Sequence, residues 1–191
     1  MSDKPNNTNH GPDSLNEIPS VDWLDLERNR DKFFKDLRYA LEECGFLILT
    51  NAPGFEDEFQ QRAFTEVRKF FDSPMDFKQA SSIANSPYVR GYSSPRPPDS
   101  GRAQVIESFQ YGFDEAPLCA HDDESQPIHE RFFRGPNTWP DSQSLPGFKP
   151  TLNELNSAYH RLTLQLGELI VESLGEDPAE FRQYFNLDEP Y

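Results

Sequence analysis

The sequence predicts an α+β protein in which helices predominate over a few short strands. Segments with apolar residues at helical spacing alternate with short strand-like runs. The chain contains 16 Phe and 7 Tyr, an aromatic content that disordered acidic chains lack. It has 17 prolines in 191 residues, a larger share than the average of about 5%. These prolines must lie in turns and long connections. A length of 191 residues suits one domain, which we expect to span residues 17–191.

Order is expected to begin near residue 18. Residues 1–16 are rich in Asn, Asp, Ser, Pro and Gly, and they are predicted to form a disordered polar tail because they can bury little apolar area. Residues 18–23 are predicted to form a short edge strand, a position in which Pro19 is tolerated.

A helix followed by a buried strand is predicted next. Residues 31–44 carry one apolar stripe, and the stripe consists of Phe33, Leu37, Leu41 and Cys44. Gly45 is expected to end this helix. The continuous apolar run at residues 46–50 has the length of a strand and predicts one buried on both faces. Residues 51–54 then turn the chain.

A second helix is predicted over residues 55–71, with Phe residues along its apolar stripe. Ser73 and Pro74 are expected to act as the N-cap and first-turn proline of a short helix that ends at residue 77. Residues 80–101 are predicted to be mainly loop around a short extended segment at residues 88–92.

Residues 105–113 alternate as a strand does, and one face is apolar except for Glu107. We keep three interpretations of this acid open: a partly solvated strand end, a salt bridge to an arginine, and a contact to a substrate.

The C-terminal third is predicted to be dominated by one long helix. Residues 114–150 form a proline-bearing connection of a length that is often functional. Residues 151–174 carry a long apolar stripe, which Gly175 ends. Asp177 and Pro178 are expected to open a last helix at residues 179–185.

The charge balance argues against several classes of partner. The 33 acidic residues outweigh 18 basic ones, for a net charge of −15, which disfavours nucleic acids and anionic membranes. No run of 18 apolar residues and no signal-peptide pattern occurs. Cys44 and Cys119 are too few for a disulfide scaffold. We therefore expect a cytoplasmic protein.

One motif with metal-ligand spacing occurs, at His121 and Asp123. Two histidines and a carboxylate can hold non-haem iron, and His129, His160 or His10 could supply the missing ligand. The surrounding stretch is polar and acidic, with no strand pattern that would hold the ligands in place. We favour an ordinary loop and expect no metal site; an unusual metal site is the alternative. Phosphate-loop, nucleophile-elbow and zinc-protease motifs do not occur.

Seven short segments together carry a resemblance to a known family. They are residues 18–22, 43–51, 70–78, 90–92, 107–112, 137–140 and 145–148. In this order they resemble the N-terminal region of iron- and 2-oxoglutarate-dependent dioxygenases of the isopenicillin N synthase-like branch, from about residue 18 onward. One departure is Ala52, which stands where the family usually has the histidine of Asn-His-Gly.

The resemblance implies helices and a few strands that pack on a jelly-roll core, or double-stranded β-helix, which is incomplete here. The family's His-x-Asp, distant histidine and Arg-x-Ser would lie beyond residue 191, so we expect a chain truncated before the catalytic core. Fe(II) and 2-oxoglutarate are implied for the complete enzyme, whereas we expect no cofactor and no turnover for this chain alone.

The resemblance also implies substrate-binding residues, namely Arg90, Tyr92, Glu107 and Phe109. Arg90 could pair with a substrate carboxylate; an Arg90–Glu107 salt bridge is the alternative. The expected function is oxidation of a small molecule, with secondary metabolism as the expected setting. The competing hypothesis is a non-catalytic interaction module that uses exposed apolar faces to form a homo- or hetero-oligomer with a full-length paralogue or a separately encoded catalytic half.

Overall fold

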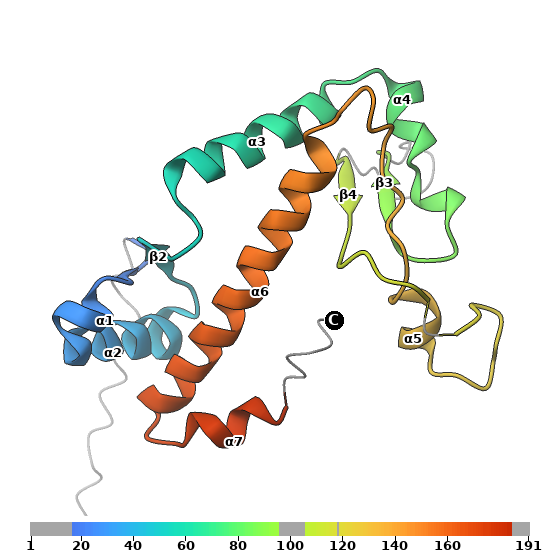
Figure 1. Cartoon of the computed structure of the whole chain (residues 1–191). Coiled ribbons are helices and arrows are strands. Elements are labelled where there is room, and N and C mark those ends of the chain that lie inside the picture. The colour runs from blue at the N-terminus through green and yellow to red at the C-terminus, as the bar shows by residue number, and fades with distance from the viewer. Residues whose placement is uncertain (1–16, 96–105, 118, 185–191) are drawn as a thin grey trace, which may run out of the picture. The chain divides into compact units, whose positions relative to one another are not determined.

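A computed structural model describes residues 17–95, 106–117 and 119–184, so the predicted tail at residues 1–16 lies outside the described residues. Helices and short strands are both present, which confirms the α+β class (Figure 1). The elements in chain order are β1 (Ser20–Asp22), α1 (Asp25–Arg28), α2 (Arg30–Tyr39), the π-helix η1 (Ala40–Cys44), β2 (Ile48–Thr50), α3 (Asp57–Phe71), α4 (Met75–Ala80), the 3₁₀-helix η2 (Ile83–Asn85), β3 (Gly91–Ser93), β4 (Ser108–Gln110), α5 (Ile128–Phe132), α6 (Phe148–Ser173) and α7 (Pro178–Arg182).

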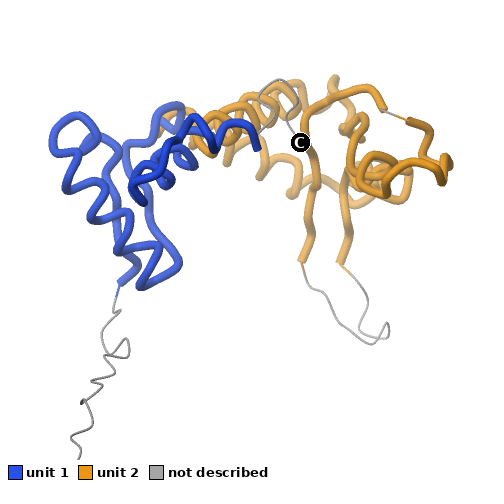
Figure 2. The backbone as a smooth tube through the Cα atoms, turned by 90° about the horizontal axis from the view of Figure 1, so that it is seen from below, with its two compact units in different colours: residues 1–56, 164–185 blue, residues 57–163, 186–191 orange. Residues whose placement is uncertain are grey.

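The chain divides into two compact units (Figure 2). Unit 1 comprises residues 1–56 and 164–185, and unit 2 comprises residues 57–163 and 186–191. Each unit has its own apolar core.

Unit 1 is built around the strand pair β1–β2, which is parallel and places Val21 opposite Leu49. Its core consists of Val21, Phe33, Leu37 and Ala40, against which Leu166, Leu169 and Ile170 of α6 pack. The predicted helix at residues 31–44 is confirmed as α2 and η1, and Gly45 ends it at φ 77°. The Gly45 amide donates to the carbonyl of Ala40, the wider spacing of a π-helix. Ala40, rather than the predicted Leu41, completes the buried stripe.

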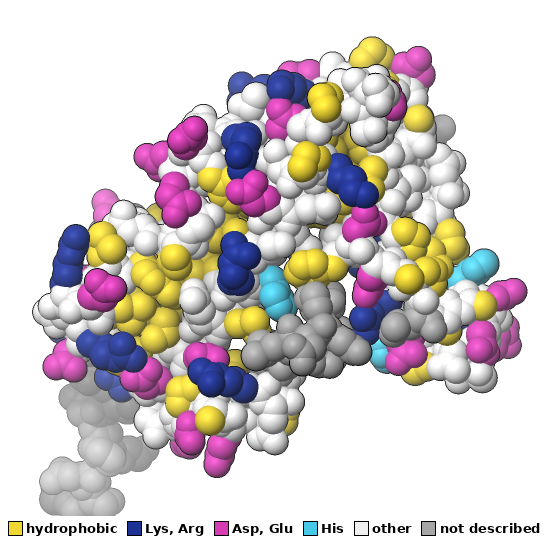
Figure 3. Space-filling view, in the orientation of Figure 1, with side chains coloured by type: hydrophobic (Ala, Val, Ile, Leu, Met, Phe, Trp, Pro, Cys, Tyr) yellow, Lys and Arg dark blue, Asp and Glu magenta, His cyan; other side chains and the backbone are white. Residues whose placement is uncertain are grey.

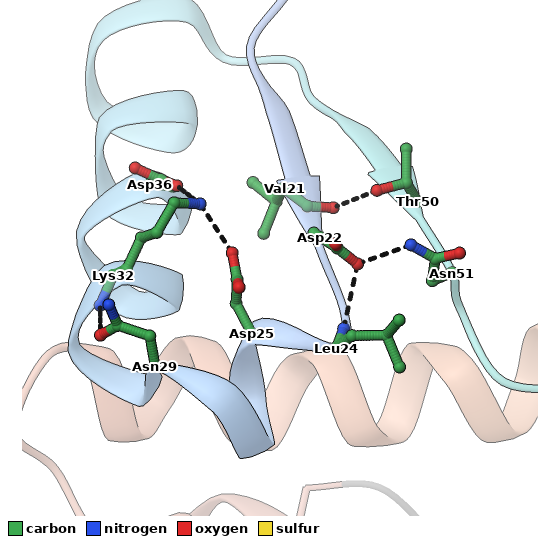
Figure 4. Close-up of polar contacts among 9 residues, drawn as sticks. All are labelled: Val21, Asp22, Leu24, Asp25, Asn29, Lys32, Asp36, Thr50 and Asn51. Carbon is green, nitrogen blue, oxygen red and sulfur yellow. Dashed lines mark hydrogen bonds and ion pairs between the residues drawn. The ribbon is translucent and has the colours of Figure 1, made fainter.

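The ends of β1 and β2 are joined by polar contacts (Figure 4). Asp22 Oδ1 accepts hydrogen bonds from the Leu24 amide at 3.1 Å and from Asn51 Nδ2 at 2.8 Å. Asn51 adopts φ 54°, the left-handed conformation expected of the turn at residues 51–54. The hydrogen bond from Asn51 and, to a smaller extent, the one from the Leu24 amide favour the ionised carboxylate, so the pKa of Asp22 lies below its usual value.

The prediction that residues 46–50 form a strand buried on both faces is wrong. The strand β2 covers only Ile48–Thr50 and pairs with β1 alone within the described residues. Phe46 is 72% exposed and Ile48 is about half exposed. Hydrophobic side chains gather on the visible face of unit 1 (Figure 3). Sequence pattern gives the apolar character of a strand, whereas burial depends on which elements cover each of its faces.

Unit 2 contains an aromatic core around Phe70, which is fully buried. The Phe70 ring stacks on that of Phe148, with centroids 4.9 Å apart, and meets the ring of Phe109 edge-on at 5.1 Å. Tyr92 and Leu152 complete the buried cluster. The helix α3 confirms the one predicted at residues 55–71, and α6 confirms the long helix, although it begins at Phe148.

The strands β3 and β4 pair antiparallel, with Tyr92 opposite Phe109. Gly91 enters β3 at φ 122°, and a Cβ atom there would lie 2.4 Å from the carbonyl oxygen of Ser81. The absence of a side chain at Gly91 therefore lets the Tyr92 amide donate to Ser81 O at 2.8 Å. The predicted strand at residues 105–113 is confirmed only as β4, and Val105 lies outside the described residues.

Three helix ends test the capping predictions. Ser73 is not the N-cap of α4: its hydroxyl donates to Lys69 O at 2.7 Å, and Pro74 occupies the cap position. The helix α4 also runs on to Ala80 rather than ending at residue 77. Asp177 is confirmed as the cap of α7, since Oδ1 accepts from the Ala179 amide at 2.8 Å.

The long connection contains one helix that the pattern did not predict, α5. None of the helices within the described ranges combines the length and apolarity needed to cross a membrane. The strands of an incomplete jelly roll stay a prediction.

We expect Phe70→Ala to lower the free energy of unfolding of unit 2 by about 3–5 kcal/mol, because a buried aromatic ring leaves a cavity. Phe64→Ala is the matched control: Phe64 lies on the same helix, α3, but is 67% exposed, and its loss should cost about 0.5 kcal/mol or less. Urea unfolding followed by Trp139 fluorescence, in a Trp23→Phe background, would report on unit 2. Equal losses for the two variants would contradict the assigned core.

Candidate functional site

Pairing of β3 with β4 brings the predicted site residues Tyr92 and Phe109 opposite each other, and Glu107 immediately precedes β4. Tyr92 is fully buried. Phe109 belongs to the aromatic cluster: its ring stacks on that of Trp139 with centroids 5.7 Å apart and meets Phe148 edge-on at 5.2 Å. The paired strands β3 and β4 therefore connect the aromatic cluster to Glu107, the residue just before β4.

Glu107 is paired with a lysine that sequence analysis did not single out. Lys78 Nζ lies 2.6 Å from Glu107 Oε2 and also donates to the carbonyl oxygen of Phe71 at 3.0 Å. The hydroxyl of Tyr92 donates to the same Oε2 at 2.8 Å. The Lys78 side chain is only 6% exposed, whereas that of Glu107 is 31% exposed. The three residues form a cluster whose cation and hydroxyl lie inside the protein and whose carboxylate reaches the surface.

The charges of this cluster alter two ionisation equilibria. The hydrogen bond from Lys78 and, to a smaller extent, the one from Tyr92 hold the pKa of Glu107 below its usual value. Burial raises the pKa of Tyr92 to about 12, and the hydrogen bond to Glu107 and the negative charge of Glu107 act in the same direction. At neutral pH the cluster therefore holds an ionised carboxylate and a neutral phenol.

Of the three interpretations of Glu107, the salt bridge is present, but the predicted arginine partner is wrong. Within the described residues Arg90 directs Nη2 to Phe133 O at 2.6 Å and Nη1 to Val89 O at 3.3 Å. The backbone at Gly112 leaves room for the guanidinium, since a Cβ atom there would lie 2.6 Å from Nη2. Lys78 could reach Glu107 because α4 packs beside β3, a tertiary contact that the spacing along the chain did not reveal.

Not every donor of the Arg90 guanidinium is hydrogen-bonded within the described residues. Its Nε is buried and has no hydrogen-bond partner in the described part of the chain. Burial lowers the pKa of Arg90, while the negative charge of Glu115 acts in the opposite direction. Glu115 itself pairs with Arg134 at 2.8 Å.

His121 and Asp123 do not form a metal centre with other described residues. They lie in a turn region, which confirms the loop interpretation. The Asp123 carboxylate accepts from the hydroxyl and amide of Ser125 at 2.6 and 3.1 Å. The part of the chain that the structure describes contains no group of three His, Cys, Asp or Glu side chains able to hold a metal ion. These donors do not fit the iron site that the resemblance implies for a complete dioxygenase.

Comparisons with known proteins agree with the resemblance. The family model described as "non-haem dioxygenase in morphine synthesis N-terminal" matches residues 18–142. The chain is 28% identical over 188 residues to the 2-oxoglutarate-dependent dioxygenase frbJ of Dothideomycetidae sp. (strain 11243), covering 93% of this chain and 47% of that protein. It is 33% identical over 171 residues to kihadalactone A synthase LFS of Citrus sinensis, covering 81% and 48%.

A solved structure shares the fold. The full-length Neurospora crassa protein crystallised in complex with alpha-KG and 5-formyluracil aligns with a TM-score of 0.67 and 26% identity, covering 86% of this chain and 47% of that one. The chain thus spans about half the length of the proteins that it matches.

Lys78→Met should lower the free energy of unfolding by about 1–3 kcal/mol at neutral pH, because it leaves the Phe71 carbonyl without this donor and leaves the Glu107 carboxylate with the Tyr92 hydroxyl but without its cation. The loss should shrink below about pH 4, since a carboxylate with a lowered pKa stabilises the folded state only while it is ionised. Urea unfolding at several pH values measures this. Lys35→Met, on an exposed position of α2, is the control, and an equal cost for it at neutral pH would contradict the assignment.

Tyr92 should ionise later than an ordinary tyrosine. Its raised pKa means that the neutral phenol stabilises the folded state below about pH 10, and that this contribution is lost as pH rises toward 12. Absorbance at 295 nm should therefore show fewer tyrosines titrating near pH 10 in the folded protein than in the unfolded protein. Tyr92 should account for one of the missing tyrosines, whatever the number of other tyrosines that ionise late. Tyr92→Phe should remove only the late component; an unchanged alkaline curve argues against the buried hydrogen bond.

Proposed function

Because the chain belongs to the family of non-haem dioxygenase N-terminal domains, we propose that it is the N-terminal part of a 2-oxoglutarate-dependent oxidoreductase that oxidises a small molecule. The observation that carries the proposal is the family match at residues 18–142, which includes all residues of the Lys78 cluster as well as Arg90 and Phe109. Relatives matched over most of this chain carry 2-oxoglutarate-dependent dioxygenase in their names, which supports the reaction class.

The proposed role of this chain is to form part of the substrate pocket. Glu107 and Arg90 supply polar groups of opposite charge, Phe109 supplies an apolar ring, and Tyr92 acts through its hydrogen bond to Glu107. The names of relatives include a kihadalactone A synthase and an azadirone synthase, which supports a substrate from specialised small-molecule metabolism. We propose a cytoplasmic location on the composition alone.

Iron and 2-oxoglutarate enter the proposal only through the complete enzyme. The described donor groups do not fit an iron site, so we propose that the ligands belong to the half of the relatives that this chain does not match. Bound iron and 2-oxoglutarate would supply the oxidising chemistry, and this chain alone would not turn over.

A second candidate function is a non-catalytic interaction module. The exposed apolar side chains of unit 1, above all Phe46 and Ile48, favour it, because burial of such surface against a partner is energetically favourable. The partner would be a full-length paralogue or a separately encoded catalytic half.

Turnover distinguishes the two functions. Co-expression of this chain with the part of the frbJ protein that it does not match should give a complex that forms succinate from 2-oxoglutarate when Fe(II) is present, whereas the chain alone should form none and should not be stabilised against heat by the two ligands together. The frbJ part expressed by itself is the control. Succinate formation by this chain alone would contradict the proposal, and a stable complex without turnover would favour the interaction module.

A further inference from the structure

The two carboxylate oxygens of Glu107 have different surroundings. Oε2 accepts from Lys78 Nζ at 2.6 Å and from the Tyr92 hydroxyl at 2.8 Å. Among the described residues no donor reaches Oε1, although the side chain is only 31% exposed. Within the described part of the chain, Oε2 therefore accepts two hydrogen bonds and Oε1 accepts none.

The inner donors determine how the carboxylate is oriented. Lys78 is nearly buried and donates a hydrogen bond to Phe71 O, and Tyr92 is fully buried. Both donors therefore hold Glu107 from the inside of the protein. Because two inner donors hold Oε2 and the Glu107 side chain is still 31% exposed, we infer that Oε1 is the oxygen that meets the accessible side. Burial of an ammonium group is costly. Here the buried ammonium of Lys78 contacts one oxygen of the Glu107 carboxylate, Oε2, and thereby fixes the orientation of that carboxylate.

The charge state determines what Oε1 can bind. Because the pKa of Glu107 is lowered, Oε1 at neutral pH is an anionic acceptor without a proton to donate. A hydroxyl or an N–H group complements it, whereas a ligand carboxylate would be repelled. Arg90 directs its terminal nitrogens to the protein backbone instead: Nη1 donates to Val89 O and Nη2 donates to Phe133 O.

We propose that Glu107 Oε1 accepts a hydrogen bond from a hydroxyl or N–H group of the small-molecule substrate, and that Lys78 is the positioning residue that orients the carboxylate for this contact. The inference rests on the proposed function for the identity of the ligand as a substrate. It requires the substrate to carry a neutral or cationic hydrogen-bond donor at this point, and it assigns Tyr92 a positioning role beside Lys78.

A substitution at Glu107 should invert the ligand preference. In Glu107→Gln, Lys78 and Tyr92 both donate, so they select the amide oxygen for the inner position and turn the NH₂ group outward. The accessible group then changes from acceptor to donor. Benzamide and benzoate, which share one shape, are suitable probes: benzamide carries an N–H donor, and benzoate offers only acceptors.

The experiment is a titration of the full chain with each probe, followed by NMR of the labelled side chain at position 107. The unsubstituted chain should bind benzamide about tenfold more tightly than benzoate, the ratio expected for one hydrogen bond to a charged group. Glu107→Gln should reverse the order. Glu124→Gln, which removes one charge from an exposed position, should keep the original order.

The role of Lys78 is tested by adding Lys78→Met to Glu107→Gln. Without the ammonium, Tyr92 alone holds the amide, which can turn over, and the reversed preference should disappear even though the protein is folded by circular dichroism. In Lys78→Met alone, the pKa of Glu107 read from its carboxyl resonance should rise, an effect that a purely structural lysine elsewhere would not produce.

Several outcomes would overturn the inference: equal binding of both probes by the unsubstituted chain, no response of Glu107 to benzamide, or the same change of order in Glu124→Gln. The first two need no variant, so they remain decisive if Glu107→Gln fails to fold. Because the probes require neither iron nor turnover, this result is separate from the succinate test of the proposed function.

Discussion

A buried ammonium group needs an anion within reach, and Lys78 meets this requirement in unit 2 through Glu107. The pair connects α4 to the residue that precedes β4, and Tyr92 brings β3 to the same oxygen. The carbonyl of Phe71 at the end of α3 completes the shell of the ammonium. Groups from the end of α3, from α4, from β3 and from the residue before β4 thereby meet at one point, because polar groups are costly to bury unpaired.

The aromatic cluster beneath this point provides the rigidity. Phe70 contacts the rings of Phe109, Phe148 and Tyr92 at once, so the α3, α6 and hairpin segments share one core. Two glycines permit the close approaches at its edge: Gly91 lies against the Ser81 carbonyl, and Gly112 lies against the Arg90 guanidinium. A tightly packed base of this kind limits the movement of Glu107, which is what a hydrogen-bonding contact with defined orientation needs.

Several acidic side chains of this chain are held by local contacts. The chain belongs to the family of non-haem dioxygenase N-terminal domains, and within it Asp123 accepts from Ser125 and Asp114 pairs with Lys149. Asp114 illustrates this commitment: its carboxylate also accepts from the indole of Trp139 at 3.2 Å and from the Asn137 amide at 3.1 Å. These acids stabilise the connection between β4 and α6 rather than offering free ligands.

The sequence by itself determined the three longest helices, α2, α3 and α6, the glycine end of the first and the family, because helical spacing, helix-ending glycines and ordered motifs are local properties. It also marked Glu107 as unusual, since an acid on an apolar strand face needs a partner. Only the tertiary structure decided that the partner is Lys78 rather than Arg90, and that Phe46 and Ile48 are exposed. Both outcomes depend on which segments pack together across long stretches of chain, and the energy of a buried charge or an apolar face is set by those neighbours rather than by the residues beside it in sequence.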